Sequence, residues 1–158
     1  MSTDVKPIPE GHPSVIPSLP IRGAAKAIDF YQRAFGAEEV YRLDMPDGKI
    51  GHAEIRIGDS MIMLSDECPE WGSLSPESVG GAPTKICLYV SDADATFQKA
   101  LDAGAEQVMA VADQFWGDRM GSVKDPFGYT WIVATHVEDV SHEEIARRFQ
   151  EMLKEGKK

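Results

Sequence analysis

The two halves of this sequence repeat each other, and this repeat limits the folds that the chain can adopt. Residues 36–40 (Gly-Ala-Glu-Glu-Val) recur as residues 104–108 (Gly-Ala-Glu-Gln-Val), an offset of 68 positions. Ile21 matches Val90 at an offset of 69 positions. The order of predicted elements is also the same in both halves. We therefore expect a duplicated module, because a fixed period is the sequence sign of repeated structural units.

The first half predicts a strand, a helix and three further strands. The predicted strands are 15–21, 39–44, 49–57 and 60–65, and the predicted helix is 24–35. Apolar residues recur at helical spacing across 24–35, and Gly36 suits the end of a helix. Pro17 and Pro20 have no N–H group to donate, so the first strand should lie at a sheet edge.

The second half predicts the same elements in the same order. The predicted strands are 85–90, 106–112, 118–124 and 129–135, and the predicted helix is 92–103. Residues 125–128 read Asp-Pro-Phe-Gly, in which proline presets φ and glycine tolerates a left-handed conformation, so they predict a tight turn. The predicted fold class is α+β, with two tandem βαβββ modules forming a curved mixed sheet and an additional C-terminal helix.

The predicted organisation has five parts. These are a flexible N-terminal arm (1–13), the first module (14–66), a linker or lid (67–83), the second module (84–137) and a C-terminal helix (138–158). Ser141 and Glu144 stand three positions apart before an apolar stripe, as in a capping box. Trp71 in the 67–83 segment is a candidate lid residue.

Composition excludes several classes of partner. The net charge of −10 over 158 residues disfavours nucleic acid and anionic membranes, whose phosphates need clustered Lys and Arg. The two cysteines, Cys68 and Cys87, lack the spacing of zinc or redox motifs, and Cys87 is expected to be buried. We find no apolar signal core and no membrane-spanning stretch, so a cytoplasmic protein is expected.

Several motifs resemble the vicinal oxygen chelate superfamily, which includes glyoxalase I, bleomycin-resistance proteins, fosfomycin-resistance proteins and extradiol dioxygenases. The superfamily motifs are Ala-Ile-Asp-Phe-Tyr at 27–31 and the turn at 125–128. Four further motifs are most similar to the PhnB-like branch of this superfamily: His-Ala-Glu at 52–54, Ile-Gly-Asp-Ser at 57–60, Met-Leu-Ser-Asp at 63–66 and Trp-Gly-Asp-Arg at 116–119. The resemblance covers roughly 15–137. It implies a sheet curved into a cup and a homodimer.

The resemblance also implies where a metal ion would bind. Metal enzymes of the superfamily place their ligands on the first and last strands of each module, and the corresponding positions here are Ile16, Met63, Lys85 and Ile132. Isoleucine has no donor atom, a thioether is soft, and a lysine ammonium must first lose its proton. We therefore expect no metal ion and no cofactor at these positions.

A displaced catalytic site is the alternative. His52 and Glu54 are two apart on one predicted strand, so their side chains share a face and offer two metal ligands, with His136 or Asp118 as a distant third. Lys85 and Glu54 acting as acid and base are another possibility. The competing interpretation of the His52–Glu54 pair is an ordinary exposed strand surface. His12 and His142 are not expected to be catalytic.

The predicted inward surface of the cup is apolar, and its flexible side chains can adapt to a flat or apolar small molecule. It comprises Ile16, Met61, Met63, Cys87, Tyr89, Ile132 and Ala134. The competing interpretation is that these residues are simply core. Burying the Lys85 ammonium in an apolar wall would cost free energy unless it met an anion. This anion could be a negative group of the ligand or the carboxylate of Glu54. Trp116 and Arg119 are expected at a pocket rim, unless they only stabilise their loop.

The sequence thus predicts a metal-free protein that binds an amphiphilic or aromatic small molecule. The candidate ligand-binding residues are Trp116, Arg119, Lys85, Tyr89, Met63, Ile132, His52 and Glu54. The alternative is a metal-dependent lyase, isomerase or dioxygenase with its site at His52 and Glu54. A third possibility is an interaction module whose cup is filled and inert. The sequence leaves open which ligand binds and whether any reaction is catalysed.

Overall fold

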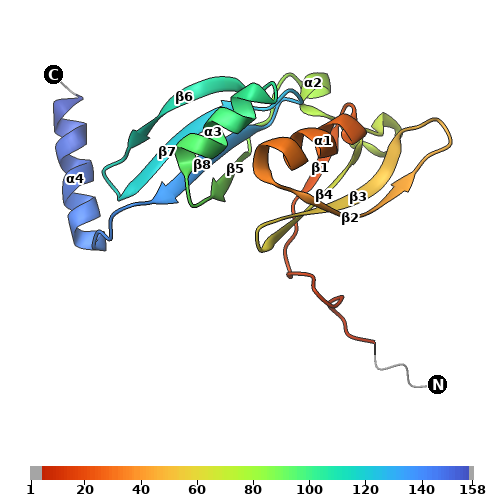
Figure 1. Ribbon diagram of the computed structural model, residues 1–158, viewed down its shortest axis with the longest axis horizontal. Helices are drawn as coiled ribbons and strands as arrows, with labels where there is room; N and C mark the ends of the chain where they lie inside the picture. The colour runs from red at the N-terminus through yellow and green to blue at the C-terminus, as the bar shows by residue number, and fades with distance from the viewer. Residues whose placement is uncertain (1–4, 157–158) are drawn as a thin grey trace. The chain divides into compact units, whose positions relative to one another are not determined.

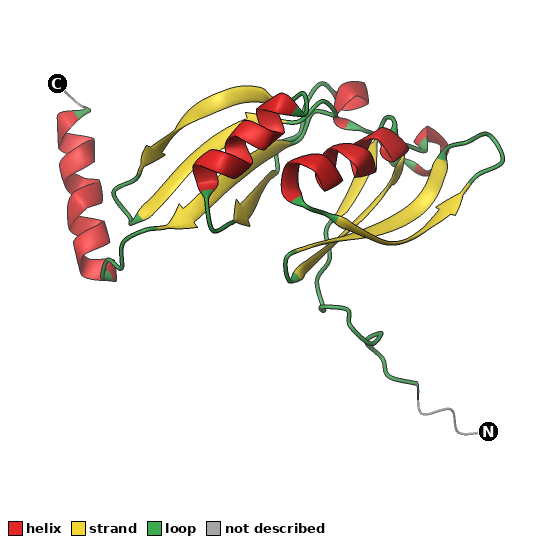
Figure 2. Ribbon diagram, viewed as in Figure 1, coloured by secondary structure: helices red, strands yellow, loops and turns green. Residues whose placement is uncertain are grey.

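The computed structural model describes residues 5–156, and its chain divides into two compact units. The N-terminal unit comprises residues 1–81 and the C-terminal unit residues 82–158, so the boundary lies inside the predicted linker. Each unit contains one four-stranded mixed sheet with a helix on one of its faces, as the ribbons in Figure 1 and Figure 2 show. The predicted α+β class and duplicated βαβββ plan are confirmed.

The N-terminal unit builds its sheet in the order β1-β4-β3-β2. Its elements are β1 (Ser18–Ile21), α1 (Ala24–Phe35), β2 (Glu38–Asp44), β3 (Ile50–Ile57) and β4 (Ser60–Asp66). β1 runs parallel to β4, and the other pairs are antiparallel. β1 lies at an edge, as Pro17 and Pro20 predict, and it begins at Ser18 rather than at the predicted residue 15.

The C-terminal unit repeats this order as β5-β8-β7-β6. Its elements are β5 (Lys85–Tyr89), α3 (Ala93–Asp102), β6 (Glu106–Asp113), β7 (Asp118–Lys124), β8 (Thr130–His136) and α4 (His142–Glu155). β5 is parallel to β8. The core lies between α3 and the sheet, where Phe97, Val123, Trp131 and Val133 are buried.

Corresponding side chains hold the start of the first helix in each unit. Asp66 at the end of β4 accepts hydrogen bonds from the backbone N–H groups of Gly23 and Ala24, at 3.0 and 3.2 Å. In the C-terminal unit, the Thr135 hydroxyl of β8 accepts one from the N–H of Ala93 at 2.8 Å. Both contacts satisfy N–H groups that the first turn of a helix leaves unpaired. The repeat therefore extends from the order of elements to single hydrogen bonds.

The predicted turn at 125–128 joins β7 to β8 and is fixed by a buried carboxylate. One oxygen of Asp125 accepts from the N–H groups of Phe127 and Tyr129, both at 2.9 Å, and the other accepts from Trp131 Nε1 at 2.9 Å. Asp125 thus ties the turn to the largest buried side chain of the core. These bonds replace the water that the Asp125 carboxyl group loses on burial.

The segment predicted as a linker or lid contains two short helical turns. It holds a 3₁₀ turn, η1 (Pro69–Trp71), and a one-turn helix, α2 (Pro76–Val79), and a bridge pairs Cys68 with Ser73. The sequence predicted no helix there, because proline at the first position and Ser75 as N-cap begin α2 without any apolar periodicity. The role of this segment as a lid stays a prediction.

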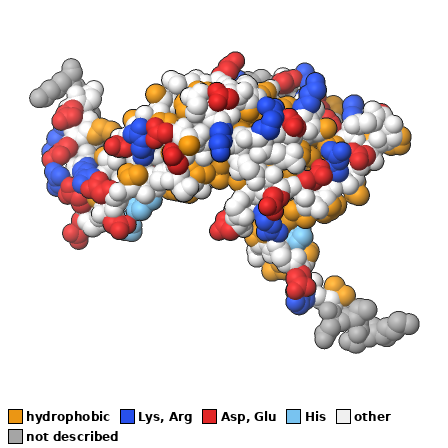
Figure 3. Space-filling model, in the orientation of Figure 1, with side chains coloured by type: hydrophobic (Ala, Val, Ile, Leu, Met, Phe, Trp, Pro, Cys, Tyr) orange, Lys and Arg blue, Asp and Glu red, His pale blue; other side chains and the backbone are white. Residues whose placement is uncertain are grey.

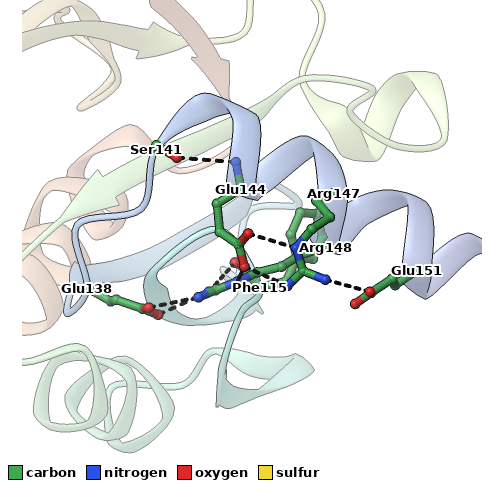
Figure 4. Close-up of polar contacts among 7 residues, drawn as sticks. All are labelled: Phe115, Glu138, Ser141, Glu144, Arg147, Arg148 and Glu151. Atoms are coloured by element: carbon green, nitrogen blue, oxygen red, sulfur yellow. Dashed lines mark hydrogen bonds and ion pairs between the residues drawn. The ribbon is translucent and has the colours of Figure 1, made fainter.

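α4 begins at the predicted N-cap, since Ser141 Oγ accepts from the N–H of Glu144 at 3.2 Å. All residues of α4 are half-buried or exposed, and charges of both signs cover it (Figure 3). Arg148 attaches it to the β6–β7 turn by donating to the Phe115 carbonyl at 3.0 Å, and to the segment between β8 and α4 by pairing with Glu138 at 2.9 Å (Figure 4). Among the described residues, no helix is long and apolar enough to cross a membrane.

Candidate functional site

The C-terminal unit presents a sheet face that its own helix leaves uncovered, the side of β5–β8 opposite α3, which we call the open face. The strand register defines which side chains it carries, because directly paired residues point to the same side. Cys87 pairs with Ile132 and Tyr89 with Ala134 across β5 and β8. On β7, Ser122 and Met120 continue these two rows. The middle of the open face is therefore mainly apolar, as predicted.

Asp118 is the centre of a hydrogen-bond cluster at one end of the open face. Its side chain is only 6% exposed. One carboxylate oxygen accepts from the Tyr89 hydroxyl at 2.7 Å and from Trp116 Nε1 at 3.0 Å. The other oxygen accepts from His136 Nδ1 at 2.9 Å. A single buried carboxylate thus fixes two aromatic rings and one imidazole from three parts of the chain.

This cluster shifts the pKa values of its members. Burial raises the pKa of the Asp118 carboxyl, but the hydrogen bonds from Tyr89, His136 and Trp116 together outweigh burial, and the net pKa is lowered. The bond to Asp118 raises the pKa of Tyr89 to about 12. The bonds to Asp118 and then Asp139 raise the pKa of His136. Near neutral pH, Asp118 is therefore an anion and Tyr89 is a neutral hydrogen-bond donor.

The Tyr89 ring is held by its hydroxyl yet remains accessible. Tyr89 is 61% exposed, and Trp116 is half-buried. A ring fixed at its polar end loses little further rotational freedom when a flat molecule stacks on it. We call Tyr89, Trp116 and the anchoring Asp118 the aromatic platform.

Phe115 and Arg119 make contacts outside the platform, although the Phe115 ring also meets the Trp116 ring edge to face, with centroids 4.9 Å apart. The Phe115 ring stacks on Phe149 of α4, with ring centroids 5.8 Å apart. The Arg119 guanidinium donates to both carboxylate oxygens of Asp94, at 2.6 and 2.8 Å, and to Asp113 at 3.1 Å. Asp94 lies on α3, so Arg119 reaches toward the helix side of the sheet. Arg119 as a ligand-binding residue stays a prediction, while these ion pairs give it a structural role.

The N-terminal unit holds a second buried carboxylate, on β3. Glu54 is 3% exposed. It accepts from His12 Nε2 at 3.1 Å on one oxygen, and from His52 Nε2 at 3.3 Å and the Tyr41 hydroxyl at 3.4 Å on the other. The predicted convergence of His52 and Glu54 on one face is confirmed. His12, which the sequence places in the arm, joins them.

Electrostatics keep Glu54 ionised. Burial raises the pKa of its carboxyl, but the hydrogen bonds from His52 and His12 outweigh that effect and lower the net pKa. Burial, followed by the charge of Glu54, raises the pKa of Tyr41. In the described part of the chain, no group of three or more His, Cys, Asp or Glu side chains is arranged to hold one metal ion. Metal binding at His52 and Glu54 stays a prediction.

The structure places the four implied metal-ligand positions in different settings. Ile16 lies before β1, while Met63 is half-buried on β4 and pairs with Ser18. Ile132 is half-buried on β8 and pairs with Cys87, while Lys85, at the start of β5, is exposed. Met63 and Ile132 thus occupy matching places in the two ladders, as the repeat predicts.

The prediction of a buried Cys87 was wrong, because the residue is exposed. The apolar run around Cys87 suggested that this residue is a small buried hydrophobic side chain. In fact, β5 is an edge strand, and its residues alternate between half-buried and exposed. The free thiol therefore belongs to the open face.

Sequence reasoning missed the roles of Asp118, His136 and His12. Asp118 and His136 were considered only as distant metal ligands, yet they bond to each other across β7 and β8. Nothing in the sequence pairs Tyr89 with Asp118, because that contact depends on sheet register.

Comparisons with known proteins agree with this fold. The family model described as Glyoxalase/Bleomycin resistance protein/Dioxygenase superfamily matches residues 15–133. The protein Rv0887c of Mycobacterium tuberculosis H37Rv is 48% identical over 136 residues, which cover 84% of this chain and 80% of that protein. The solved structure of the Arabidopsis thaliana gene product At5g48480 has a TM-score of 0.64 at 30% identity, covering 77% of this chain and 98% of that one.

A PhnB protein from Bacillus cereus is also similar in structure. Its TM-score is 0.62 at 17% identity, covering 78% of this chain and 99% of that one, and at this identity the likeness concerns the fold alone. The family resemblance predicted from the sequence motifs is confirmed.

Proposed function

We propose that this chain, which belongs to the Glyoxalase/Bleomycin resistance protein/Dioxygenase superfamily, binds an aromatic or amphiphilic small molecule on the open face of its C-terminal unit without a metal ion. One observation carries the proposal: buried Asp118 anchors both Tyr89 and Trp116, and leaves Tyr89 61% exposed. A buried anion with three donors is costly to assemble merely to present an aromatic ring to water.

The rest of the open face supports this proposal. Cys87, Ile132 and Met120 provide soft, polarizable or apolar surface next to the platform. Aromatic stacking contributes about 0.5–1.5 kcal/mol beyond the apolar area that is buried. A flat apolar ligand would thus gain from both stacking and burial, and its binding would need no catalytic group.

A titration with 1-pyrenebutanol, a neutral aromatic probe, tests the proposal. Fluorescence anisotropy of the pyrene is expected to show saturable binding to the full chain. Tyr89→Ala and Trp116→Ala are each expected to raise Kd by about ten-fold, because each removes one stacking surface. Circular dichroism confirms that each variant is folded.

Trp71→Ala is the matched control, since Trp71 is 87% exposed on η1 in the N-terminal unit. Its affinity for the probe is expected to equal that of the wild type. An equal loss in all three variants would mean that any exposed ring on this chain captures pyrene, and would refute a specific platform. Absence of saturable binding to the wild type would refute the proposal outright.

We also propose that the chain forms a homodimer and that it is located in the cytoplasm. α4 presents an apolar stripe formed by Ile145, Phe149, Met152 and Leu153. Phe149, Met152 and Leu153 are each more than 40% exposed, which suits a partner surface. The enzyme alternatives, a metal ion at His52 and Glu54 or an acid–base pair of Lys85 and Glu54, stay predictions.

A further inference from the structure

Two lysines and a threonine stand side by side at the end of the open face opposite the platform. Thr130 on β8 pairs with Lys85 on β5 and with Lys124 on β7. Cross-strand partners point to the same side of a sheet. This Lys85–Thr130–Lys124 row therefore places two ammonium groups on either side of a hydroxyl.

The row shares its face with the platform. The preceding and following positions on these strands, Val123 and Trp131, are buried against the helix side, so Lys124 and Thr130 point to the opposite side. On β5, Lys85 is two residues from Cys87 and four from Tyr89. At about 3.3 Å per residue, the row lies about 13 Å from the Tyr89 position and about 7 Å from Cys87.

Neither lysine forms an ion pair with a neighbouring carboxylate in the described residues. Glu106 on β6 is the cross-strand partner of Lys124, but no ion pair joins Lys85 or Lys124 to a carboxylate within residues 5–156. Adjacent strands are about 4.8 Å apart, so the two lysine Cα atoms are about 10 Å apart. Both flexible side chains can reach one anion above Thr130.

We propose that the ligand is an organic anion, whose carboxylate, sulfonate or phosphonate group binds the Lys85–Thr130–Lys124 row while its aromatic part lies on the platform. This inference rests on the proposed function. Along the open face, the side chains are basic at the row, apolar at Cys87 and Ile132, and aromatic at Tyr89. An amphiphile whose anionic group and aromatic part lie about 13 Å apart matches that order. The overall charge of −10 matters less than this local field.

A matched pair of probes tests the inference. 1-Pyrenebutyrate and 1-pyrenebutanol share the ring and the chain and differ in the charged end. At about 50 mM salt, where screening is weak, the wild type is expected to bind the carboxylate about five- to ten-fold more tightly. Lys85→Gln and Lys124→Gln are each expected to weaken pyrenebutyrate binding about three- to five-fold and to leave pyrenebutanol binding unchanged.

Lys99→Gln is the control, because it makes the same charge change on α3, on the covered side of the sheet. Its affinity for pyrenebutyrate is expected to equal that of the wild type. Equal affinity of the wild type for both probes, or an equal loss in Lys99→Gln, would overturn the anion site while leaving the platform intact. Failure of both probes to bind the wild type would instead overturn the platform, and the anion site with it.

Discussion

Replacing Asp118 with asparagine isolates the charge that organises the platform. The amide is nearly isosteric, so the change leaves packing intact. One side-chain oxygen remains and can still accept from Tyr89 and Trp116. The other position becomes an NH₂ group, which faces His136 Nδ1, 2.9 Å from the carboxylate oxygen in the wild type.

The expected loss of stability follows from these contacts. Hydrogen bonds to a charged group contribute about 1.5–3 kcal/mol, and Asp118 is only 6% exposed, so we expect Asp118→Asn to lower the free energy of unfolding by about 1.5–3 kcal/mol. The bond from His136 should add less than this, because that side chain is 53% exposed and screened by solvent.

The loss should depend on pH. The pKa of His136 is raised in the folded wild type, so its contribution is fully present below its unfolded pKa of about 6.5 and is lost as pH rises through the folded pKa. In the variant, neutral His136 can accept from the amide at Nδ1 and donate to Asp139 from Nε2, so protonation no longer strengthens its contact with residue 118. The difference between wild type and variant should therefore be larger at about pH 6 than at about pH 8.5.

Urea unfolding at both pH values measures this difference. The lowered pKa of Asp118 keeps it ionised throughout this range, because its contribution is lost only as pH falls through that lowered value. Asp102→Asn, an exposed change on α3, serves as the control and should change stability by less than about 0.5 kcal/mol. A loss for Asp118→Asn as small as that of the control, or one that grows with pH, would refute this reasoning.

Two further predictions concern the fold and the assembly. Gly121→Ala would bring a Cβ atom within 2.9 Å of the Met109 carbonyl oxygen and 3.0 Å of the Phe97 ring, so we expect a destabilisation of about 1–3 kcal/mol in thermal unfolding. Gly51→Ala should be nearly neutral, because its closest contact is the flexible Met45 side chain at 3.2 Å and the Leu43 carbonyl oxygen lies at an ordinary 3.6 Å. Sedimentation at micromolar concentration is expected to give a dimer that Met152→Glu with Leu153→Glu converts to a monomer; a monomeric wild type would contradict the proposed homodimer.

The sequence predicted the elements of both units because local chemistry specifies them. α1 spans 24–35 and β7 spans 118–124, as their apolar periodicity and flanking turns indicated. Gly36 ends α1 in a left-handed conformation, with φ 68°. β1 is shorter than predicted: it begins at Ser18 rather than at residue 15, because Pro17 directly before it has no N–H group for strand pairing.

The candidate site was predicted only in part, because its central contacts join residues distant in sequence. Tyr89 and Trp116 were identified from their type and place. Their shared partner Asp118 was not, since the Tyr89–Asp118 bond spans 29 positions and requires the β5-β8-β7 order. The basic row of Lys85, Thr130 and Lys124 likewise exists only once the register is known.

Indole N–H resonances in ¹⁵N-correlated NMR spectra report directly on whether a ligand stacks on the Asp118-anchored rings. The three indoles, Trp71, Trp116 and Trp131, lie in distinct settings, exposed, half-buried and buried. On titration with 1-pyrenebutanol, we expect the Trp116 resonance to move upfield with saturation while those of Trp71 and Trp131 stay in place. Movement of Trp71 with an unchanged Trp116 would contradict binding at the platform.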